Sequence, residues 1–267
     1  MTAPSNELMH DDDVVIRVRD LCNRFGANLV HDNLDLDLRR GEILAVVGGS
    51  GVGKSVLLRT MLGLRRPDAG EVRVFGRNMQ QLSDHERVAI ERRFGVLFQN
   101  GALFTSLSIS DNICVPLLEH TGLSRDDAKR VAALKVALVG LPLDVGQYYP
   151  SQLSGGMRKR AAMARALALD PDILFLDEPT AGLDPIAAAE FDQLIHTLRD
   201  AIGLTVFMVT HDIDSLHAIA DRVAVLAARR VVVADTLDKV ERFDDPWVRE
   251  YFHGPRARMA RTAHAQA

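Results

Sequence analysis

The segment from Gly48 to Ser55 constrains the fold of this chain most strongly, and it reads Gly-Gly-Ser-Gly-Val-Gly-Lys-Ser. It follows the apolar run Ile43–Val47 and leads into a helical pattern from Val56 to Leu62. A strand, a glycine-rich turn and a helix start, in this order, are the context in which the pattern G-x-x-x-x-G-K-S binds the phosphates of a nucleoside triphosphate. Backbone N–H groups of such a loop converge on phosphate oxygens, and the helix dipole adds to the attraction. The sequence therefore predicts an α/β fold that binds a nucleotide.

Each position of this loop has an expected role. Lys54 is expected to reach the terminal phosphates, and the Ser55 hydroxyl is expected to hold Mg²⁺. The remaining positions are expected to surround the phosphates with their backbone: Gly48, Gly49, Ser50, Gly51, Val52 and Gly53. An incidental glycine-rich turn would also carry these residues, but the flanking strand and helix patterns favour the phosphate loop.

Composition excludes several other classes of protein. The chain has 267 residues and is 47% hydrophobic, enough for a substantial core in one large domain or two small ones. A net charge of −4 does not suit a protein that coats nucleic acid. We therefore expect no nucleic acid among the partners. Cys22 and Cys114 lie far apart, which favours reduced, buried thiols over a disulfide or metal site.

The chain has no segment that looks like a signal peptide or a membrane span. Its N-terminus is polar and acidic through Asp13, and no apolar stretch approaches the roughly 20 residues of a membrane helix. We therefore expect a cytosolic chain with no membrane span of its own. Any association with a membrane would come through a partner.

Hydrophobic patterns predict two sheets. Three runs alternate apolar with polar residues and are expected to pair in an antiparallel sheet: Val14–Val18, Leu34–Leu38 and Glu71–Val74. Four runs are almost wholly apolar, as in a parallel sheet covered by helices: Ile43–Val47, Val96–Phe98, Ile173–Leu176 and Val206–Val209. Apolar residues from Phe191 to Ile202 follow helical spacing and complete a βαβ unit.

The chain divides into a main domain and two extensions. Residues 1–12 are expected to be a flexible tail, and residues 13–242 the main domain. Helical patterns replace strands from about 101 to 169, which predicts an inserted helical subdomain. Residues 243–267 form a C-terminal extension with an aromatic segment, Trp247–Phe252, and a solvated basic tail.

A buried strand ends in two adjacent carboxylates, Asp177 and Glu178. Successive residues at a strand end point in different directions, so the two can have separate roles. Asp177 suits the Mg²⁺ shell, and Glu178 suits polarising a water for attack on the γ-phosphate. An acidic strand end that merely begins a loop is the alternative, and the phosphate loop makes it less attractive.

Another glycine pair opens a helix further along the chain. Ser154 is a good N-cap residue, and Gly155 and Gly156 permit close approach of the backbone to an anion.

His211 follows the last apolar strand. A lone histidine is often a satisfied core residue, but this position favours contact with a γ-phosphate.

These segments together resemble the ATP-binding cassette (ABC) family over roughly residues 14–240. Four short matches carry the resemblance: Leu153–Met157 to the LSGGQ signature, Gln99 to the Q-loop, Ala181–Asp184 to the D-loop and His211 to the switch histidine. Phe25 occupies the position of the aromatic residue that stacks on adenine. The resemblance implies an ABC nucleotide-binding domain with an antiparallel β subdomain and an inserted helical subdomain.

The resemblance also implies the mechanism. ABC domains work as head-to-tail pairs, so Ser154, Gly155 and Gly156 would act on ATP bound to a second copy of the chain. Asp184 would lie at the same composite site. Implied catalytic residues are Lys54, Glu178 and His211, and the implied Mg²⁺ ligands are Ser55, Gln99 and Asp177. The implied cofactors are ATP and Mg²⁺, and the implied activity is ATP hydrolysis.

One group within the family is especially similar. The segment from Gln99 to Leu117, where a permease would dock, and the segment Ser154–Ala162 resemble the ATPase subunit of MCE-associated phospholipid transporters. Asp245–Phe252 resembles it more loosely. The implied partners are a second copy, an integral-membrane permease, an MCE-domain lipid-binding protein and a STAS-type regulator. The implied location is the cytoplasmic face of the inner membrane.

Two other functions stay open from the sequence. Importers of small polar solutes share every catalytic motif but typically carry glutamine at the position of Met157. A non-transport ABC ATPase of an envelope or repair complex is the other alternative. Such relatives usually have two cassettes or a long coiled-coil insertion, and this sequence has neither.

Overall fold

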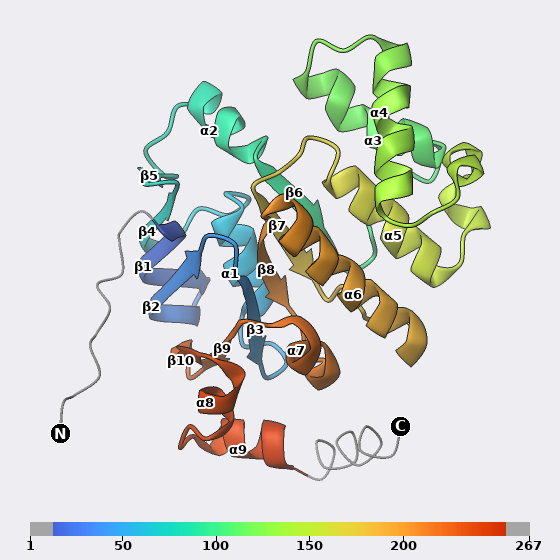
Figure 1. The fold of residues 1–267 in the computed structure, drawn as a ribbon. Helices are drawn as coiled ribbons and strands as arrows, with labels where there is room; N and C mark the ends of the chain where they lie inside the picture. The colour runs from blue at the N-terminus through green and yellow to red at the C-terminus, as the bar shows by residue number, and fades with distance from the viewer. Residues whose placement is uncertain (1–12, 255–267) are drawn as a thin grey trace, which may run out of the picture.

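The structure is a computed structural model that describes residues 13–254. Its strands form two sheets, one four-stranded in the order β2-β1-β4-β5 and one six-stranded in the order β10-β9-β3-β8-β7-β6 (Figure 1). The expected tails at residues 1–12 and 255–267 lie outside the described residues. No helix within residues 13–254 is long and apolar enough to cross a membrane.

The four-stranded sheet is antiparallel and contains the three alternating runs. Its strands are β1 (Val14–Phe25), β2 (Asn28–Arg39), β4 (Ala69–Val74) and β5 (Arg77–Asn78). Strand β1 is longer than its alternating run because it continues into a hairpin with β2, in which Phe25 pairs with Asn28. The predicted antiparallel pairing is confirmed.

The six-stranded sheet is mostly parallel. Its strands are β3 (Ile43–Gly48), β6 (Phe94–Leu97), β7 (Ile173–Asp177), β8 (Thr205–Val209), β9 (Arg222–Ala227) and β10 (Arg230–Asp235). The four apolar runs are confirmed as parallel neighbours, and β10 pairs antiparallel with β9 at the edge. Strands β9 and β10 were not predicted from the sequence. The buried run of β9 has the composition of a central strand and pairs with β3.

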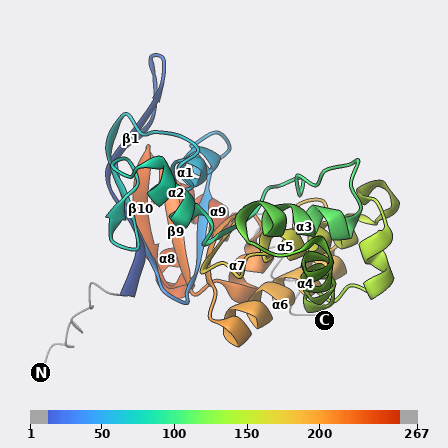
Figure 2. The ribbon, with the colours of Figure 1, turned by 90° about the horizontal axis from the view of Figure 1, so that it is seen from above.

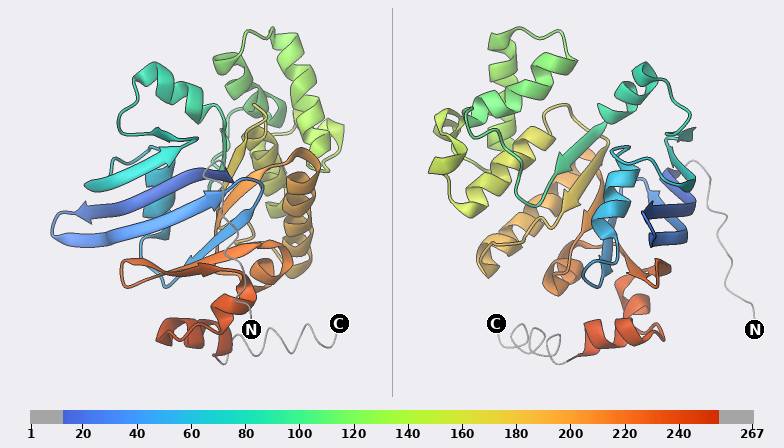
Figure 3. Two further views of the ribbon diagram at one scale, coloured as in Figure 1. Left: turned by 60° about the vertical axis from the view of Figure 1, so that its left-hand side comes forward. Right: turned by 180° about the vertical axis from the view of Figure 1, so that it is seen from behind.

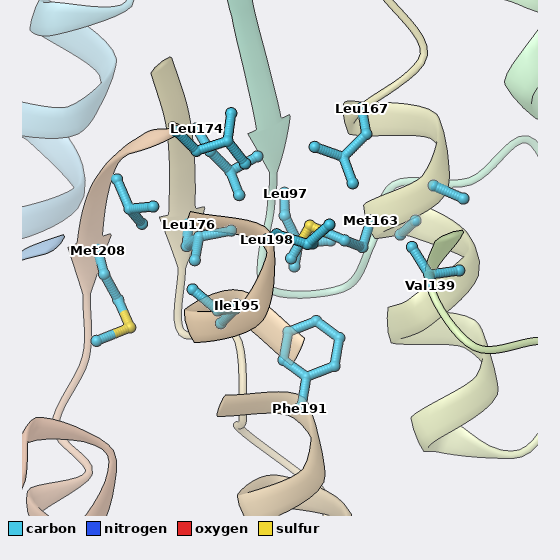
Figure 4. Packing of buried hydrophobic residues seen from close by; sticks show 14 of the residues in the cluster. Leu97, Val139, Met163, Leu167, Leu174, Leu176, Phe191, Ile195, Leu198 and Met208 are labelled. Atoms are coloured by element: carbon cyan, nitrogen blue, oxygen red, sulfur yellow. The ribbon is translucent and has the colours of Figure 1, made fainter. Parts of the chain in front are cut away.

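Helices cover both faces of this sheet. Along β3, Ile43, Ala45 and Val47 face one core cluster, and Leu44 and Val46 face the other. The first cluster packs against α6 (Pro185–Ile202) and α7 (Ile213–Ile219), and the second against α1 (Lys54–Met61) and the antiparallel sheet. Figure 4 shows side chains of the first cluster, with Phe191 of α6 packed among them. This burial on both faces explains the wholly apolar strand sequences.

The remaining helices extend from the two sheets. Helices α3 (Ile109–His120), α4 (Arg125–Leu138) and α5 (Gly155–Ala166) form a group at the side opposite the antiparallel sheet (Figure 2). Helix α2 (Asp84–Glu91) precedes β6. Helices α8 (Leu237–Glu241) and α9 (Pro246–His253) lie at one end of the large sheet in both views of Figure 3.

Candidate functional site

Three parallel strands bring the predicted site residues to one edge of the sheet. Val209 of β8 pairs with both Val46 of β3 and Asp177 of β7, so the three strands end at the same level. The phosphate loop follows β3, Glu178 follows β7, and His211 lies two residues beyond β8. In open α/β sheets, ligands bind at such carboxyl ends.

The phosphate loop has the backbone that its glycines permit. A side chain at Gly48 would place its Cβ 2.4 Å from the Leu226 carbonyl oxygen, so the strand end leaves no room for one. Gly53 has a φ of 108°, a left-handed conformation that favours glycine, and α1 begins at the next residue. Ser50, Gly51 and Ser55 are exposed, so the loop opens to solvent.

Lys54 points back into its own loop. Its Nζ donates to the carbonyl oxygens of Gly48 at 2.8 Å and Gly49 at 3.0 Å. Partial burial lowers the pKa of Lys54, while the charges of Glu178 and Asp177 oppose that shift. The ammonium therefore lies near both carboxylates and within reach of any phosphate in the loop.

The side chains of Glu178 and His211 contact each other at the open edge of the sheet. Oε2 of Glu178 lies 2.7 Å from Nδ1 of His211, so the imidazole N–H donates to the carboxylate. The Glu178 side chain is only 15% exposed, whereas that of His211 is 69% exposed. Glu178 also has a φ of 51°, a left-handed conformation that is uncommon for a residue with a side chain. Such strain clusters at functional sites.

A buried lysine joins Glu178 to the segment after β6. Lys159 of α5 is 7% exposed, and its Nζ donates to the carbonyl oxygens of Gln99 at 2.6 Å and Glu178 at 3.1 Å. Burial lowers its pKa, and the charges of Glu178 and Asp177 oppose the shift. Lys159 was not among the predicted site residues, since no local pattern reveals contacts to such distant carbonyls.

The predicted magnesium ligands have suitable chemistry. Ser55, Gln99 and Asp177 offer hydroxyl, amide and carboxylate oxygens, the hard donors that Mg²⁺ prefers. Burial and the neighbouring Glu178 charge raise the pKa of Asp177, so a cation beside it would be favoured. Residues 13–254 contain no group of three or more His, Cys, Asp or Glu that could hold a metal. A ligand set completed by nucleotide phosphates needs no such group.

The predicted adenine-stacking residue is presented at the end of β1. Phe25 is 50% exposed, and the Arg65 guanidinium carbon lies 4.0 Å from its ring centroid. Nε of Arg65 donates to Oδ1 of Asn23 at 3.1 Å, which fixes the guanidinium over the ring. One face of Phe25 is therefore covered by Arg65.

A histidine that the sequence analysis did not single out lies behind the phosphate loop. His31 is fully buried, and its Nδ1 lies 3.0 Å from Nδ2 of Asn23. A Cβ at Gly53 would lie 2.5 Å from Nε2 of His31, so the ring lies directly against the loop. Burial lowers the pKa of His31 to about 4, which keeps the imidazole neutral at pH 7.

The signature segment lies apart from the phosphate loop. Ser154 and Gly155 are exposed, and the Ser154 hydroxyl accepts from the backbone N–H of Met157 at 3.2 Å. Among residues 13–254, no hydrogen bond or ion pair joins Ser154, Gly155 or Gly156 to the loop of the same chain. Asp184 caps α6 by accepting from the backbone N–H of Ala187 at 3.0 Å.

A cavity adjoins the Glu178 and His211 side chains. Its volume is about 380 Å³, and Glu178, His211 and the residues from Thr180 to Leu183 are among its lining residues. The hydroxyl of Thr180 donates to Oδ2 of Asp212 at 3.3 Å, which joins the D-loop segment to the segment after β8. The cavity therefore gives solvent access to the Glu178 carboxylate.

Known proteins are similar to this chain in sequence. The ABC transporter family model matches residues 31–181. The "Intermembrane phospholipid transport system ATP-binding protein MlaF" of Haemophilus influenzae is 38% identical over 240 residues, 90% of each chain. The "Probable ribonucleotide transport ATP-binding protein mkl" of Mycobacterium tuberculosis is 39% identical over 243 residues, 91% of this chain and 67% of mkl.

A solved structure of an ATP-binding cassette has a similar fold. The dimeric, post-hydrolysis ATP-binding cassette MJ0796 bound to ADP and Pi has a TM-score of 0.75 and 30% identity, covering 83% of this chain and 98% of that one. The chain belongs to the ATP-binding cassette family. It is an ABC transporter ATPase that binds and hydrolyses ATP.

We predict that His31 makes stability depend on pH. Its pKa is about 4 in the folded chain and 6.5 for the unperturbed group, so the unfolded state binds the extra proton. The free energy of unfolding should fall as pH drops from about 6.5 to about 4, by up to about 3 kcal/mol. Denaturant titrations across this range should show a smaller fall for His31→Leu. His85→Gln, at an exposed histidine, should retain the wild-type slope, and equal slopes in all three proteins would contradict the prediction.

We also predict that Lys159→Met slows ATP hydrolysis at least tenfold. The change leaves the Gln99 and Glu178 carbonyls without their charged donor, and such hydrogen bonds are worth about 1.5–3 kcal/mol each. Steady-state phosphate release measures the effect, and a nucleotide-binding titration shows whether ATP still binds. Arg158→Met, at the exposed neighbouring position, is the control. Lys159→Met turnover equal to that of the control would refute the role.

Proposed function

We propose that this chain is the ATP-hydrolysing subunit of a membrane transporter that moves phospholipid between the inner and outer membranes. The observation that carries the catalytic part is the Glu178–His211 pair, 2.7 Å apart, at the sheet edge that also carries the phosphate loop. The similarity to the phospholipid transport protein MlaF supports phospholipid as the transported substance.

ATP is proposed to lie along the carboxyl ends of β3, β7 and β8. Its adenine stacks on the exposed face of Phe25, opposite the face that Arg65 covers. Its phosphates accept from the backbone N–H groups of residues 48–53, and Lys54 exchanges its two loop carbonyls for phosphate oxygens. Ser55, Gln99 and Asp177 would hold Mg²⁺, which would neutralise phosphate charge.

Glu178 is proposed to orient the attacking water. Phosphoryl transfer requires little covalent chemistry from the protein, so positioning and charge stabilisation dominate. The Glu178 carboxylate is largely buried yet open to the adjoining cavity, where a water can align with the γ-phosphate. His211, mostly exposed, can then turn an N–H toward the γ-phosphate while Lys54 stabilises the developing charge.

A second copy of the chain is proposed to complete each site. Ser154 and Gly155 are exposed, and within residues 13–254 no hydrogen bond or ion pair joins them to the phosphate loop of the same chain. A helix N-terminus with free N–H groups binds anions. The two residues would therefore cap the γ-phosphate held by the partner copy, with Gly156 and Asp184 beside them. The dimeric MJ0796 cassette supports this arrangement.

The transporter partners are proposed from exposed apolar residues after Gln99. Phe104, in the segment between β6 and α3, is 51% exposed, and Leu118 of α3 is 38% exposed. An integral-membrane permease would dock there and place the chain on the cytoplasmic face of the inner membrane. An MCE-domain lipid-binding protein and a STAS-type regulator complete the proposed complex.

Glu178→Gln tests the catalytic assignment. The amide keeps the size of the side chain but cannot act as a base, so turnover should fall to background while ATP binding survives. Single-turnover hydrolysis and a fluorescent-nucleotide titration measure the two properties on the same preparation. Glu190→Gln, at an exposed glutamate on α6, is the control. Wild-type-like turnover by Glu178→Gln in the assembled complex would overturn the role of Glu178.

A second candidate function is import of small polar solutes. The similarity at 39% identity to mkl, named a probable ribonucleotide transport ATP-binding protein, supports a small polar solute as the transported substance. Purification from native membranes in mild detergent, followed by mass spectrometry of proteins and lipids, separates the two. We expect a polytopic permease, an MCE-domain protein and bound phospholipid. A periplasmic solute-binding protein would favour the importer, and the absence of any permease would favour a non-transport ATPase.

A further inference from the structure

The C-terminal helix α9 is fixed against the core by one face. The Asp245 carboxylate caps it by accepting from the backbone N–H groups of Trp247 at 2.8 Å and Val248 at 3.3 Å. Val248 and Phe252 are buried, at 0% and 1% exposure. Trp247 and Tyr251, one turn apart, are partly buried and also pack against the core cluster.

These two aromatic side chains act as one unit. Their ring centroids are 4.6 Å apart with an interplanar angle of 16°, so the rings are stacked. The Tyr251 ring also meets Phe252 edge-on at 4.8 Å, which joins the pair to the buried face of the helix. The orientation of the pair is therefore determined by the core.

The stacked pair contacts two loops of the ATP site. The Tyr251 hydroxyl donates to the backbone carbonyl oxygen of His211 at 2.9 Å. Trp247 lies beside the phosphate loop, since a Cβ at Gly49 would be 3.4 Å from its Nε1. Helix α9 thus reaches the loop after β3 and the loop after β8 at the same end of the sheet (Figure 3).

The Tyr251 hydroxyl keeps its proton and therefore acts as a hydrogen-bond donor. Burial raises its pKa, and the negative charges of Asp212 and Glu178 raise it further. The side chain therefore stays protonated at physiological pH and can donate only to an acceptor such as the His211 carbonyl. Loss of the hydroxyl would remove this bond without removing the ring or its stacking on Trp247.

We propose that Tyr251 and Trp247 are positioning residues for ATP hydrolysis. By holding the peptide of His211, Tyr251 keeps the exposed imidazole on the side of Glu178, within reach of the γ-phosphate. Trp247 sets the position of Gly49, near the start of the phosphate loop, relative to α9. The inference rests on the proposed function, because it assigns the two residues to the site defined by Glu178 and His211.

Tyr251→Phe isolates the hydrogen bond. Because one neutral hydrogen bond is lost and the ring remains, kcat should fall about 3- to 10-fold. The Kd for ATP should stay within about twofold, since the bond is to the switch loop and not to the phosphate-binding backbone. Tyr148→Phe is the matched control, because it removes a hydroxyl that bonds Asp144 in the segment between α4 and α5. A residue with a merely structural role would change ATP affinity and thermal stability together with kcat.

Trp247 provides a second readout, since it is the chain's single tryptophan. Mg²⁺-ATP added to the full-length chain should produce a saturable change in its emission, with a midpoint that matches the Kd from a fluorescent-nucleotide titration. Emission that stays constant while ATP binds would overturn the Trp247 contact. Unchanged kcat in Tyr251→Phe, or parallel losses of kcat and affinity, would overturn the Tyr251 role. Absence of wild-type turnover would instead contradict the proposed function, and the emission titration would still decide the contact.

Discussion

The parallel register of β3, β8 and β7 is the constraint on which the rest of the site depends. Val209 pairs with Val46 on one side and Asp177 on the other, so three loops leave the sheet at the same level. Lys54, Glu178 and His211, which follow these strands, belong to neither hydrophobic core cluster. A shift of one residue in either pairing would turn apolar side chains of a strand from one core cluster toward the other. The hydrophobic cores on both faces therefore fix the positions of groups that contribute nothing to those cores.

Polar contacts then hold the loops at this edge. Lys159 reaches from α5 to the carbonyl oxygens of Gln99 and Glu178, and Lys54 bridges two carbonyls of its own loop. The buried His31 ring packs against Gly53 of the phosphate loop. The Tyr251 hydroxyl donates a hydrogen bond to the His211 carbonyl oxygen. Preorganised loops suit phosphoryl transfer, in which positioning and charge stabilisation supply most of the rate enhancement.

The sequence predicts the elements whose pattern is local. Period-two alternation identified the antiparallel strands, and the glycine-rich loop identified the end of β3, because both signals depend on near neighbours in the chain. Glu178 and His211 were assigned to the γ-phosphate because each follows a buried apolar strand, but the strand register that brings them to Lys54 was not predicted. Contacts of Lys159, His31 and Tyr251 were not predicted, since each joins segments far apart in sequence. Strand β9 was missed because its apolar run carried no motif.

The central claim is that two copies of the chain share each ATP site, and cross-linking tests it most directly. Cys22→Ser and Cys114→Ala remove the native thiols, after which Ser50→Cys and Gly155→Cys are made in separate, differently tagged copies carrying Glu178→Gln. Both positions are exposed, so a short bismaleimide can reach them. Mixed copies should form a cross-linked heterodimer only with Mg²⁺-ATP. Absence of that heterodimer while ATP is bound would contradict a site shared between two copies.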